Sequence, residues 1–235
     1  MLSRRDAAGA RQLGTWRVDV PELELIIGNK NYSSWSLRPW LAMKVAGIPF
    51  REQVIPLYLE DSKAKLLAVS PVGKVPVLRS GELLVWESLA ICETVAEMFP
   101  EKVLWPRARD ARGHARAVSH EMHSGFAALR SEMAMNLRLR KRVSPAPATR
   151  DDIDRIVAIW DDCRRRYGQA GEFLFGRFSI ADAMYAPVVG RFETYGVDLV
   201  GPSADYAATI RALPEYQEWC AAGREEGWTI PGAEA

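Results

Sequence analysis

The feature that most constrains this chain is the order in which strand-like and helix-like runs follow one another. From residue 23 to residue 99 the order is strand, helix, strand, short helix, strand, strand, helix. Two strands joined through a helix form a parallel pair with a right-handed crossover, whereas two strands joined by a short turn form an antiparallel hairpin. The pattern therefore predicts a mixed α/β domain. Its expected strands are 23–29, 50–57, 75–80 and 83–88, and its expected helices are 36–47, 62–68 and 88–99.

The remainder of the chain has a helical pattern only. No strand signal follows residue 101, and apolar residues at positions 122, 126, 129, 133 and 137 recur at spacings of three and four. This spacing predicts one long helix over residues 111–142. A further helix is expected to begin at an N-cap, Thr149, and to close at Gly168, with acidic residues in its first turn and basic residues in its last.

Two domains follow from these patterns. A mixed α/β domain is expected over residues 22–101, and an all-helical domain over residues 109–230. Residues 1–21 show no sustained period and are expected to form a flexible leader outside the fold. The stretch FSIADA places Ser179 and Asp182 at the spacing of a capping box, which predicts the start of a core helix in the second domain.

The charge of the chain is nearly balanced. Thirty-one basic and thirty acidic residues give a formal net charge of +1, so no overall field attracts nucleic acid or an anionic membrane. The basic stretch NLRLRKR, residues 136–142, is interpreted as a solvated helix end. No apolar run approaches the ~20 residues that span a bilayer, and the first 20 residues lack the apolar core of a signal peptide. We therefore expect a cytoplasmic protein with no nucleic-acid or membrane partner.

The histidines and cysteines do not have the spacing of a metal site. His120 and His123 lie one turn apart on a predicted helix, but no third ligand is within sequence reach. The cysteines Cys92, Cys163 and Cys220 are odd in number and far apart, which argues against a disulfide framework or a zinc site. We expect no bound metal, and three reduced thiols buried in helices.

Three segments of the first domain carry residues that could bind a ligand. In YSSWSLR, residues 32–38, the serines either cap a helix or hold a substrate. In GKVPVL, Pro76 precedes an apolar strand, where a cis bond after Val75 suits a tight turn. In WESLAI, Glu87 and Ser88 stand where a strand becomes a helix, and the free N–H groups of that helix start would suit a carboxylate.

In this order and spacing, the three segments resemble the first domain of the cytosolic glutathione transferases, and the helical second half with FSIADA is similar as well. The serine followed five residues later by an arginine, Ser33 to Arg38, is most similar to the serine-type classes such as zeta, tau and theta. The resemblance implies an α/β thioredoxin-like domain of βαβ-α-ββα order, followed by an all-α helical-bundle domain. It also implies a homodimer and a role in detoxification.

The resemblance assigns a part of glutathione to each segment. The backbone of Val75, exposed by the turn at Pro76, would pair with the cysteinyl backbone as an added strand does. Ser88 and its helix start would hold the γ-glutamyl carboxylate, and Glu87 the adjacent ammonium. Lys74 would bind the glycyl carboxylate or a backbone carbonyl.

The same resemblance assigns the chemistry to the start of the first helix. Ser33 would donate its hydroxyl to the glutathione sulfur, with Ser34 as the rival, and the nearby N–H groups and the helix dipole would favour the thiolate. No cofactor is implied beyond glutathione as co-substrate. A small apolar electrophile is expected to lie against the residues Trp35, Met122, Phe126 and Tyr185.

Two other functions fit the same residues. One is glutathione-dependent cis-trans isomerisation, as in the zeta class, whose motif is close to SSCSWRVR; here Trp35, Leu37 and Pro39 stand in place of its cysteine, tryptophan and valine. The other is a binding or regulatory module that keeps the fold without turnover, because a fold does not fix a function. The set Ser33, Pro76, Glu87 and Ser88 favours an enzyme.

Overall fold

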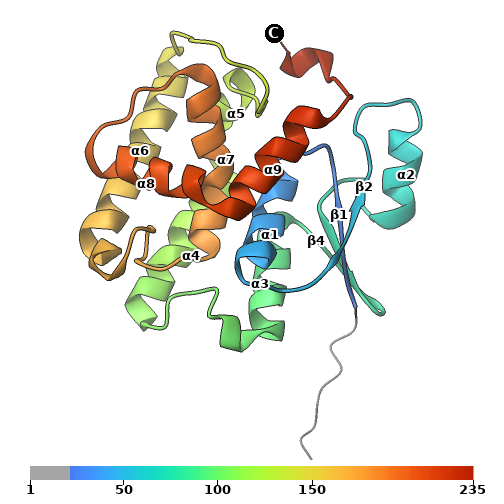
Figure 1. Ribbon diagram of the computed structural model, residues 1–235, viewed down its shortest axis with the longest axis horizontal. Helices are drawn as coiled ribbons and strands as arrows, with labels where there is room; N and C mark the ends of the chain where they lie inside the picture. Colours follow the sequence, from blue (N-terminus) through green and yellow to red (C-terminus); the bar gives the residue numbers. More distant parts are fainter. Residues whose placement is uncertain (1–21, 235) are drawn as a thin grey trace, which may run out of the picture.

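A four-stranded sheet organises the first domain of the protein (Figure 1), for which a computed structural model describes residues 22–234. The strands are β1 (Leu23–Ile27), β2 (Arg51–Val54), β3 (Val77–Ser80) and β4 (Leu83–Trp86), in the order β2-β1-β3-β4. β1 pairs with β2 in parallel and with β3 antiparallel, and β3 and β4 form an antiparallel hairpin. The predicted mixed sheet is confirmed, and the expected leader, residues 1–21, lies outside the described residues.

Helices cover both faces of this sheet. They are α1 (Ser34–Val45), α2 (Ser62–Val69) and α3 (Ser88–Met98), close to the three predicted ranges. Every residue of β1 is buried, because Leu25 and Ile27 join the main core with α1 and α3, while Ile26 joins a second cluster with Leu66 of α2. Successive side chains of a strand point to opposite faces, so a strand covered on both sides is mostly apolar. The exception in β1 is Glu24, whose buried carboxylate pairs with Arg51 and Arg79.

The second domain is a helical bundle built around one buried helix. Its helices are α4 (Arg109–Ser124), α5 (Ala127–Glu132), α6 (Pro147–Tyr167), α7 (Ile180–Tyr195), α8 (Gly201–Ala212) and α9 (Pro214–Glu225), with short 3-10 turns at Pro100–Lys102, Gly168–Ala170 and Pro231–Ala233. α7 is buried along nearly its whole length and packs against both α1 and α4. One apolar core therefore runs through both domains.

The capping box predicted at the start of α7 is confirmed. Ser179 donates its backbone N–H to the Asp182 carboxylate at 2.8 Å, and its hydroxyl also lies 2.9 Å from that carboxylate. The second carboxylate oxygen accepts the N–H of Leu174 at 3.0 Å. Asp182 is fully buried, and this burial raises the pKa of its carboxyl group to about 6. The box thus fixes the helix that carries the interdomain contacts.

The single long helix predicted over residues 111–142 is wrong. α4 ends at Ser124, and Phe126 adopts a left-handed backbone conformation with φ of 62° before the short helix α5 begins. Arg130 donates to the carbonyl of Gly125 at 3.0 Å and also to that of Met122, which holds this corner. Residues 133–146 form an irregular segment. The apolar spacing persists through the break because each piece buries its own side chains in the same core.

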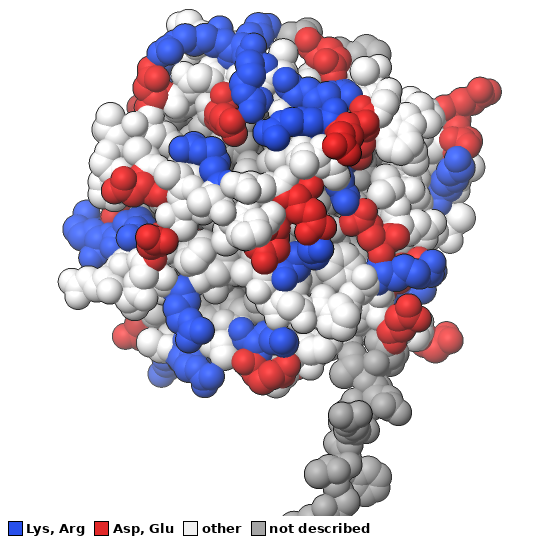
Figure 2. All heavy atoms as spheres, viewed as in Figure 1, with Lys and Arg blue, Asp and Glu red and all other residues white. Residues whose placement is uncertain are grey.

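The basic stretch 136–142 is therefore not a helix end, contrary to the prediction. Its arginines have partners within the chain: Arg140 pairs with Glu193 at 2.8 Å, and Arg142 pairs with Asp198. Basic and acidic side chains are interspersed over the face shown in Figure 2. The α6 helix also begins earlier than predicted, at Pro147, because a proline suits a first helical position.

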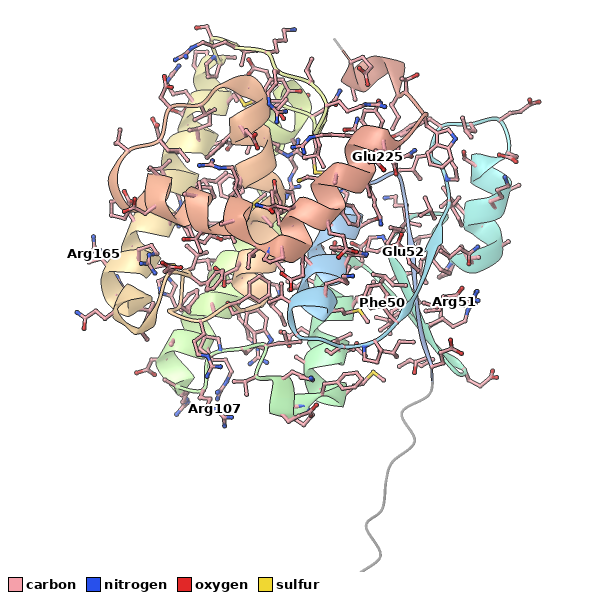
Figure 3. The ribbon with its side chains drawn as sticks, in the orientation of Figure 1. Phe50, Arg51, Glu52, Arg107, Arg165 and Glu225 are labelled. Carbon is pink, nitrogen blue, oxygen red and sulfur yellow. The ribbon has the colours of Figure 1, made fainter. Side chains whose placement is uncertain are left out.

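Many charged side chains lie at the periphery of the molecule. Arg107 and Arg165 point away from the body of the molecule in Figure 3, whereas Glu52 on β2 ties the sheet to α1. Glu52 accepts a hydrogen bond from the Trp40 ring nitrogen at 2.6 Å and pairs with Lys30 at 2.8 Å. Within residues 22–234, no helix is both long enough and apolar enough to cross a membrane.

The three cysteines are buried and free, as predicted for reduced thiols in helices. Cys92 lies in α3, Cys163 in α6 and Cys220 in α9. Burial raises the pKa of Cys92 and of Cys163 to about 12, and that of Cys220 to about 11. A thiol must ionise to act as a nucleophile, so none of these side chains is suited to covalent chemistry.

Candidate functional site

Ser33 and Ser34 stand where the loop after β1 becomes α1. Ser33 is the N-cap: its hydroxyl accepts the backbone N–H of Ser36 at 3.3 Å and lies 2.8 Å from the Ser36 hydroxyl. That second hydroxyl accepts the N–H of Gly28 at 3.1 Å. Ser34 instead accepts a hydrogen bond at 3.1 Å from Arg191 of α7, across the domain boundary. Ser33 therefore belongs to a network within the first domain, and Ser34 to the contact between domains.

The turn before β3 has the predicted form. The peptide bond between Val75 and Pro76 is cis. Pro76 is buried, whereas Val75 is half-buried and Lys74 is exposed. Val75 and Lys74 both line the cavities described below, so the turn brings this backbone to the same place as the start of α1.

Ser88 begins α3 with an unpaired hydroxyl. The residue is fully buried, and its Oγ has no hydrogen-bond partner among the described residues. Glu87 before it has φ of 72°, a conformation that costs free energy outside glycine, and its side chain is 52% exposed. Its carboxylate lies 3.7 Å from the His123 ring. A buried unpaired hydroxyl beside the free N–H groups of a helix start is suited to a carboxylate ligand.

Two adjoining cavities connect these elements. The larger has a volume of about 740 Å³ and is lined by both serines, Ser33 and Ser34. Its wall also includes residues of α2 and the loop before it, of α5 and α7, and of the C-terminal segment. The smaller, of about 170 Å³, is lined by Pro76, Glu87 and Ser88 among others. The two share Trp35, Lys74 and Val75 in their walls. Each residue predicted to bind glutathione thus lines one or both of two adjoining cavities.

The predicted electrophile pocket is only partly assembled. Trp35 lines both cavities, but Met122, Phe126 and Tyr185 are buried and line neither. The Tyr185 hydroxyl donates to the carbonyl of Val118 at 3.0 Å, which shows its structural role. The apolar part of the larger cavity's wall includes Leu57, Tyr58, Leu59, Leu66, Met135 and Ile230.

The larger cavity also contains two arginines that the sequence analysis did not select. Arg130 of α5 and Arg191 of α7 both line it, and the Arg130 guanidinium lies 4.7 Å from the centroid of the Trp35 ring. Arg38 contacts the same ring at 4.3 Å. One sequence signal of this wall is an arginine, Arg191, inside the otherwise apolar run of α7.

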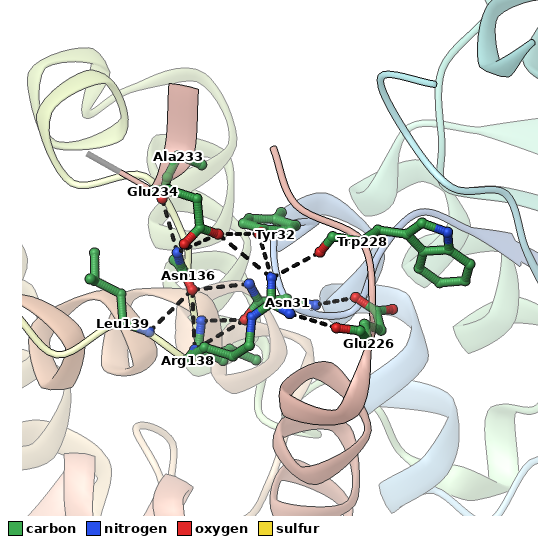
Figure 4. Close-up of polar contacts among 10 residues, drawn as sticks. Asn31, Tyr32, Asn136, Arg138, Leu139, Glu226, Trp228, Ala233 and Glu234 are labelled. Carbon is green, nitrogen blue, oxygen red and sulfur yellow. Dashed lines mark hydrogen bonds and ion pairs between the residues drawn. The ribbon is translucent and has the colours of Figure 1, made fainter. Parts of the chain in front are cut away.

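The C-terminal segment closes one side of the larger cavity (Figure 4). Arg138 donates to the Tyr32 hydroxyl at 2.6 Å and to the carbonyls of Glu226 and Trp228 at 2.5 and 2.8 Å. The Glu226 carboxylate accepts the backbone N–H groups of Lys30 and Asn31 at 2.6 and 3.0 Å. The loop that carries the two serines is therefore held by residues from the far end of the chain.

A pair of buried asparagines completes this support. The Asn31 amide donates to the Asn136 side chain at 2.9 Å, and its own side-chain oxygen accepts the backbone N–H of Leu137 at 2.8 Å. Both asparagines are fully buried, so each hydrogen bond replaces one that water would otherwise provide. Among the described residues, no group of three or more His, Cys, Asp or Glu side chains is placed to hold a metal ion.

The fold and the arrangement of the site define a two-domain protein of the thioredoxin-like transferase class. A model of the glutathione S-transferase N-terminal domain matches residues 32–98, and one of the C-terminal domain matches residues 145–222, together more than half of the chain. The chain therefore belongs to the glutathione S-transferase family.

Individual relatives are more distant. The chain is 33% identical over 108 residues to a probable maleylacetoacetate isomerase of Caenorhabditis elegans. The matched region covers 46% of this chain and 50% of that protein. It is 24% identical over 209 residues to a probable maleylacetoacetate isomerase of Vibrio cholerae, covering 83% of this chain and 95% of that protein. The first match thus spans half the length of its relative.

Solved structures share the fold. The TM-score is 0.67 with glutathione transferase Omega 2S from Trametes versicolor, at 20% identity, covering 90% of this chain and 98% of that chain. It is 0.66 with a glutathione transferase homolog from Burkholderia, solved with bound glutathione, at 22% identity, covering 87% of this chain and 100% of that chain. At these identities the likeness concerns the fold alone.

Proposed function

We propose that this protein is an enzyme that binds glutathione, ionises its thiol and adds the sulfur to a carbon electrophile. The observation that carries the proposal is the pair of adjoining cavities, with Ser33 lining the larger, Ser88 lining the smaller and Val75 in the walls of both. The γ-glutamyl carboxylate binds at Ser88, the cysteinyl backbone at Val75 and the sulfur at Ser33. Glu87 meets the ammonium, and Lys74 the glycyl carboxylate.

The start of α1 supplies the stabilisation that the thiolate needs. A cysteine thiol has a pKa of about 8.5, and lowering it by about two units takes roughly 2.7 kcal/mol. The Ser33 hydroxyl donates to the sulfur, and the N–H groups at the start of the helix and its dipole add positive potential. The thiolate then forms a C–S bond while the electrophile releases a leaving group, or while the adjacent carbon takes up a proton.

A second candidate is glutathione-dependent cis-trans isomerisation. The specific observation in its favour is that two of the relatives are described as probable maleylacetoacetate isomerases. In such a reaction the thiolate adds to one carbon of a double bond, the resulting single bond rotates, and the thiolate leaves again. The same residues would serve, so the two reactions differ in whether glutathione is consumed.

A non-catalytic role is the third candidate. The chain is also 22% identical over 180 residues to a stringent starvation protein A homolog from Haemophilus ducreyi. A binding module of this kind needs no thiol activation, so turnover separates it from an enzyme. The two serines at the start of α1 and the unpaired Ser88 hydroxyl support the enzyme.

The first experiment compares wild-type protein with Ser33→Ala and Ser34→Ala, using 1-chloro-2,4-dinitrobenzene as the electrophile. Ser33→Ala should keep glutathione affinity within a few-fold and raise the apparent pKa that governs kcat/KM, because the lost donor acts on the sulfur. The measurement is the pH–rate profile together with calorimetry of glutathione binding. If only Ser34→Ala shifts the profile, the sulfur contact belongs to Ser34; turnover absent at every pH, with intact glutathione binding, supports the binding module.

A further inference from the structure

Three arginines lie close to Trp35 and its neighbour Ser34, and two of them, Arg130 and Arg191, line the larger cavity. Arg38 and Arg130 contact the Trp35 ring, with guanidinium carbons 4.3 and 4.7 Å from its centroid. Arg191 bonds to Ser34, the neighbour of Trp35 in the chain. None of these three arginines takes part in an ion pair with another described residue. The inner wall is therefore positively charged and has no carboxylate of its own.

Of the two arginines that line the larger cavity, Arg191 is more deeply buried than Arg130. It is 5% exposed, and its guanidinium donates to the carbonyl of Met133 and, at 3.1 Å, to the Ser34 hydroxyl. Burial, and then repulsion by Arg130, lower its pKa to about 10. The side chain still carries its charge at neutral pH. A buried cation that meets only neutral oxygens lacks the partner that such groups usually have.

Arg130 reaches the cavity from the other side of the same wall. It is half-buried, and it donates to the carbonyls of Gly125 and Met122. Burial lowers the pKa of Arg130, and the nearby carboxylate of Asp152, which accepts the N–H of Leu129 at 2.9 Å, favours its charged form without a direct ion pair. Both arginines are thus held in position by backbone carbonyls, and neither forms a direct ion pair with a described residue.

We propose that Arg130, Arg191 and the Ser34 hydroxyl bind a carboxylate group of the second substrate. This inference rests on the proposed function, because it places that carboxylate in the cavity that would hold the glutathione sulfur. Guanidinium groups bind carboxylates through short, charge-assisted hydrogen bonds, and a desolvated wall strengthens them. The Trp35 ring and the apolar residues around it receive the rest of the molecule. The second substrate is then an acidic electrophile, in place of the wholly apolar one that the sequence suggested.

The test uses two inert product analogues that differ in one group. S-(carboxymethyl)glutathione carries a carboxylate next to the sulfur, and S-(carbamoylmethyl)glutathione carries a neutral amide of the same shape. Calorimetry with the wild-type protein should show the carboxylate binding at least about tenfold more tightly, which corresponds to about 1.4 kcal/mol. Because the preference is electrostatic, it should shrink as salt is added.

Variants assign the preference to the two arginines. Arg130→Gln and Arg191→Gln should each reduce the ratio of the two affinities to within about threefold, while the affinity for glutathione itself stays within about threefold. Arg191→Lys keeps the charge and should keep part of the preference. Arg116→Gln, on the outer surface and paired with Glu93, is the matched control and should leave the ratio unchanged. If Arg191→Gln does not fold, the affinity ratio measured with Arg130→Gln, a variant at a half-buried residue, still tests the proposal.

The outcomes separate this inference from the proposed function. Binding of glutathione with equal affinity for the two analogues overturns the carboxylate site and leaves the proposed function standing. Succinate, which has no glutathione part, provides the other arm: it should raise the melting temperature of the wild-type protein, and the two Gln variants should lose this effect. Stabilisation by succinate without any glutathione binding keeps the carboxylate site and overturns the proposed function. If glutathione does not bind and succinate does not stabilise the protein, both the carboxylate site and the proposed function are overturned.

Discussion

Replacing Ser88 by alanine tests the glutathione end of the site, because folding and binding should respond differently. The Ser88 hydroxyl is buried and forms no hydrogen bond with any described residue. Ser88→Ala therefore removes no protein hydrogen bond, and the free energy of unfolding should change by less than about 0.5 kcal/mol. In the complex the same hydroxyl meets a carboxylate, so its loss should weaken glutathione binding by about 1.5 to 3 kcal/mol.

In terms of affinity, this loss corresponds to a Kd raised by about 10- to 150-fold. The assay is calorimetry of glutathione binding, paired with a thermal or urea unfolding curve of the free protein. The matched control is Ser119→Ala in α4, a serine that is equally buried but donates to the carbonyl of Ala115 at 2.7 Å. Ser119→Ala should leave the Kd unchanged. Undiminished affinity in Ser88→Ala would refute the assignment of this helix start to the γ-glutamyl carboxylate.

Four further predictions concern glutathione binding, the stability of the fold and its assembly. Glu87→Ala should weaken glutathione binding by calorimetry, but less than Ser88→Ala does, because its side chain is 52% exposed and solvent screens the ion pair; an effect larger than that of Ser88→Ala would contradict this ranking. Asp182→Ala should lower the free energy of unfolding by about 3 kcal/mol or more in urea titrations, since it leaves the buried N–H groups of Leu174 and Ser179 unpaired. Because burial raises the pKa of Asp182 from 3.8 to about 6 on folding, the protonated carboxyl should favour folding below pH 4, and this contribution should be lost as the pH rises through 6, a trend that Asp182→Ala should lack. Light scattering at micromolar concentration should report about twice 26.3 kDa for the expected homodimer, and a monomer with full activity would refute it.

The first domain could be predicted almost completely from the sequence, because its signals are local. A strand buried on both faces, such as Leu23–Ile27, is mostly apolar, and the turn at Pro76 and the helix start at Ser88 are each marked by the residue that forms them. The cap at Ser33 and the box at Asp182 are likewise contained within a few residues. Such features depend on sequence neighbours, so the order of residues is sufficient to find them.

The part of the larger cavity's wall that comes from the second domain could not be predicted, because it depends on which side of each helix faces inward. Met122 and Tyr185 have the apolar character of a pocket lining, yet the bundle turns both into the core. The break in the helix at Phe126 could not be predicted, because the apolar spacing continues across it. Arg191 was visible as a charge within an apolar helix, but only the packing of α7 on α1 brings it to Ser34.

The support of the serine loop by the C-terminal segment has a consequence for synthesis of the chain. The backbone N–H of Asn31 is paired with Glu226, 195 residues later. At roughly 5 to 20 residues per second, translation separates the two by about 10 to 40 s. During that interval the start of α1 has left the ribosome without its final partners. The thiol-binding geometry is therefore among the last to be completed, and a growing chain presents no finished site to the glutathione around it.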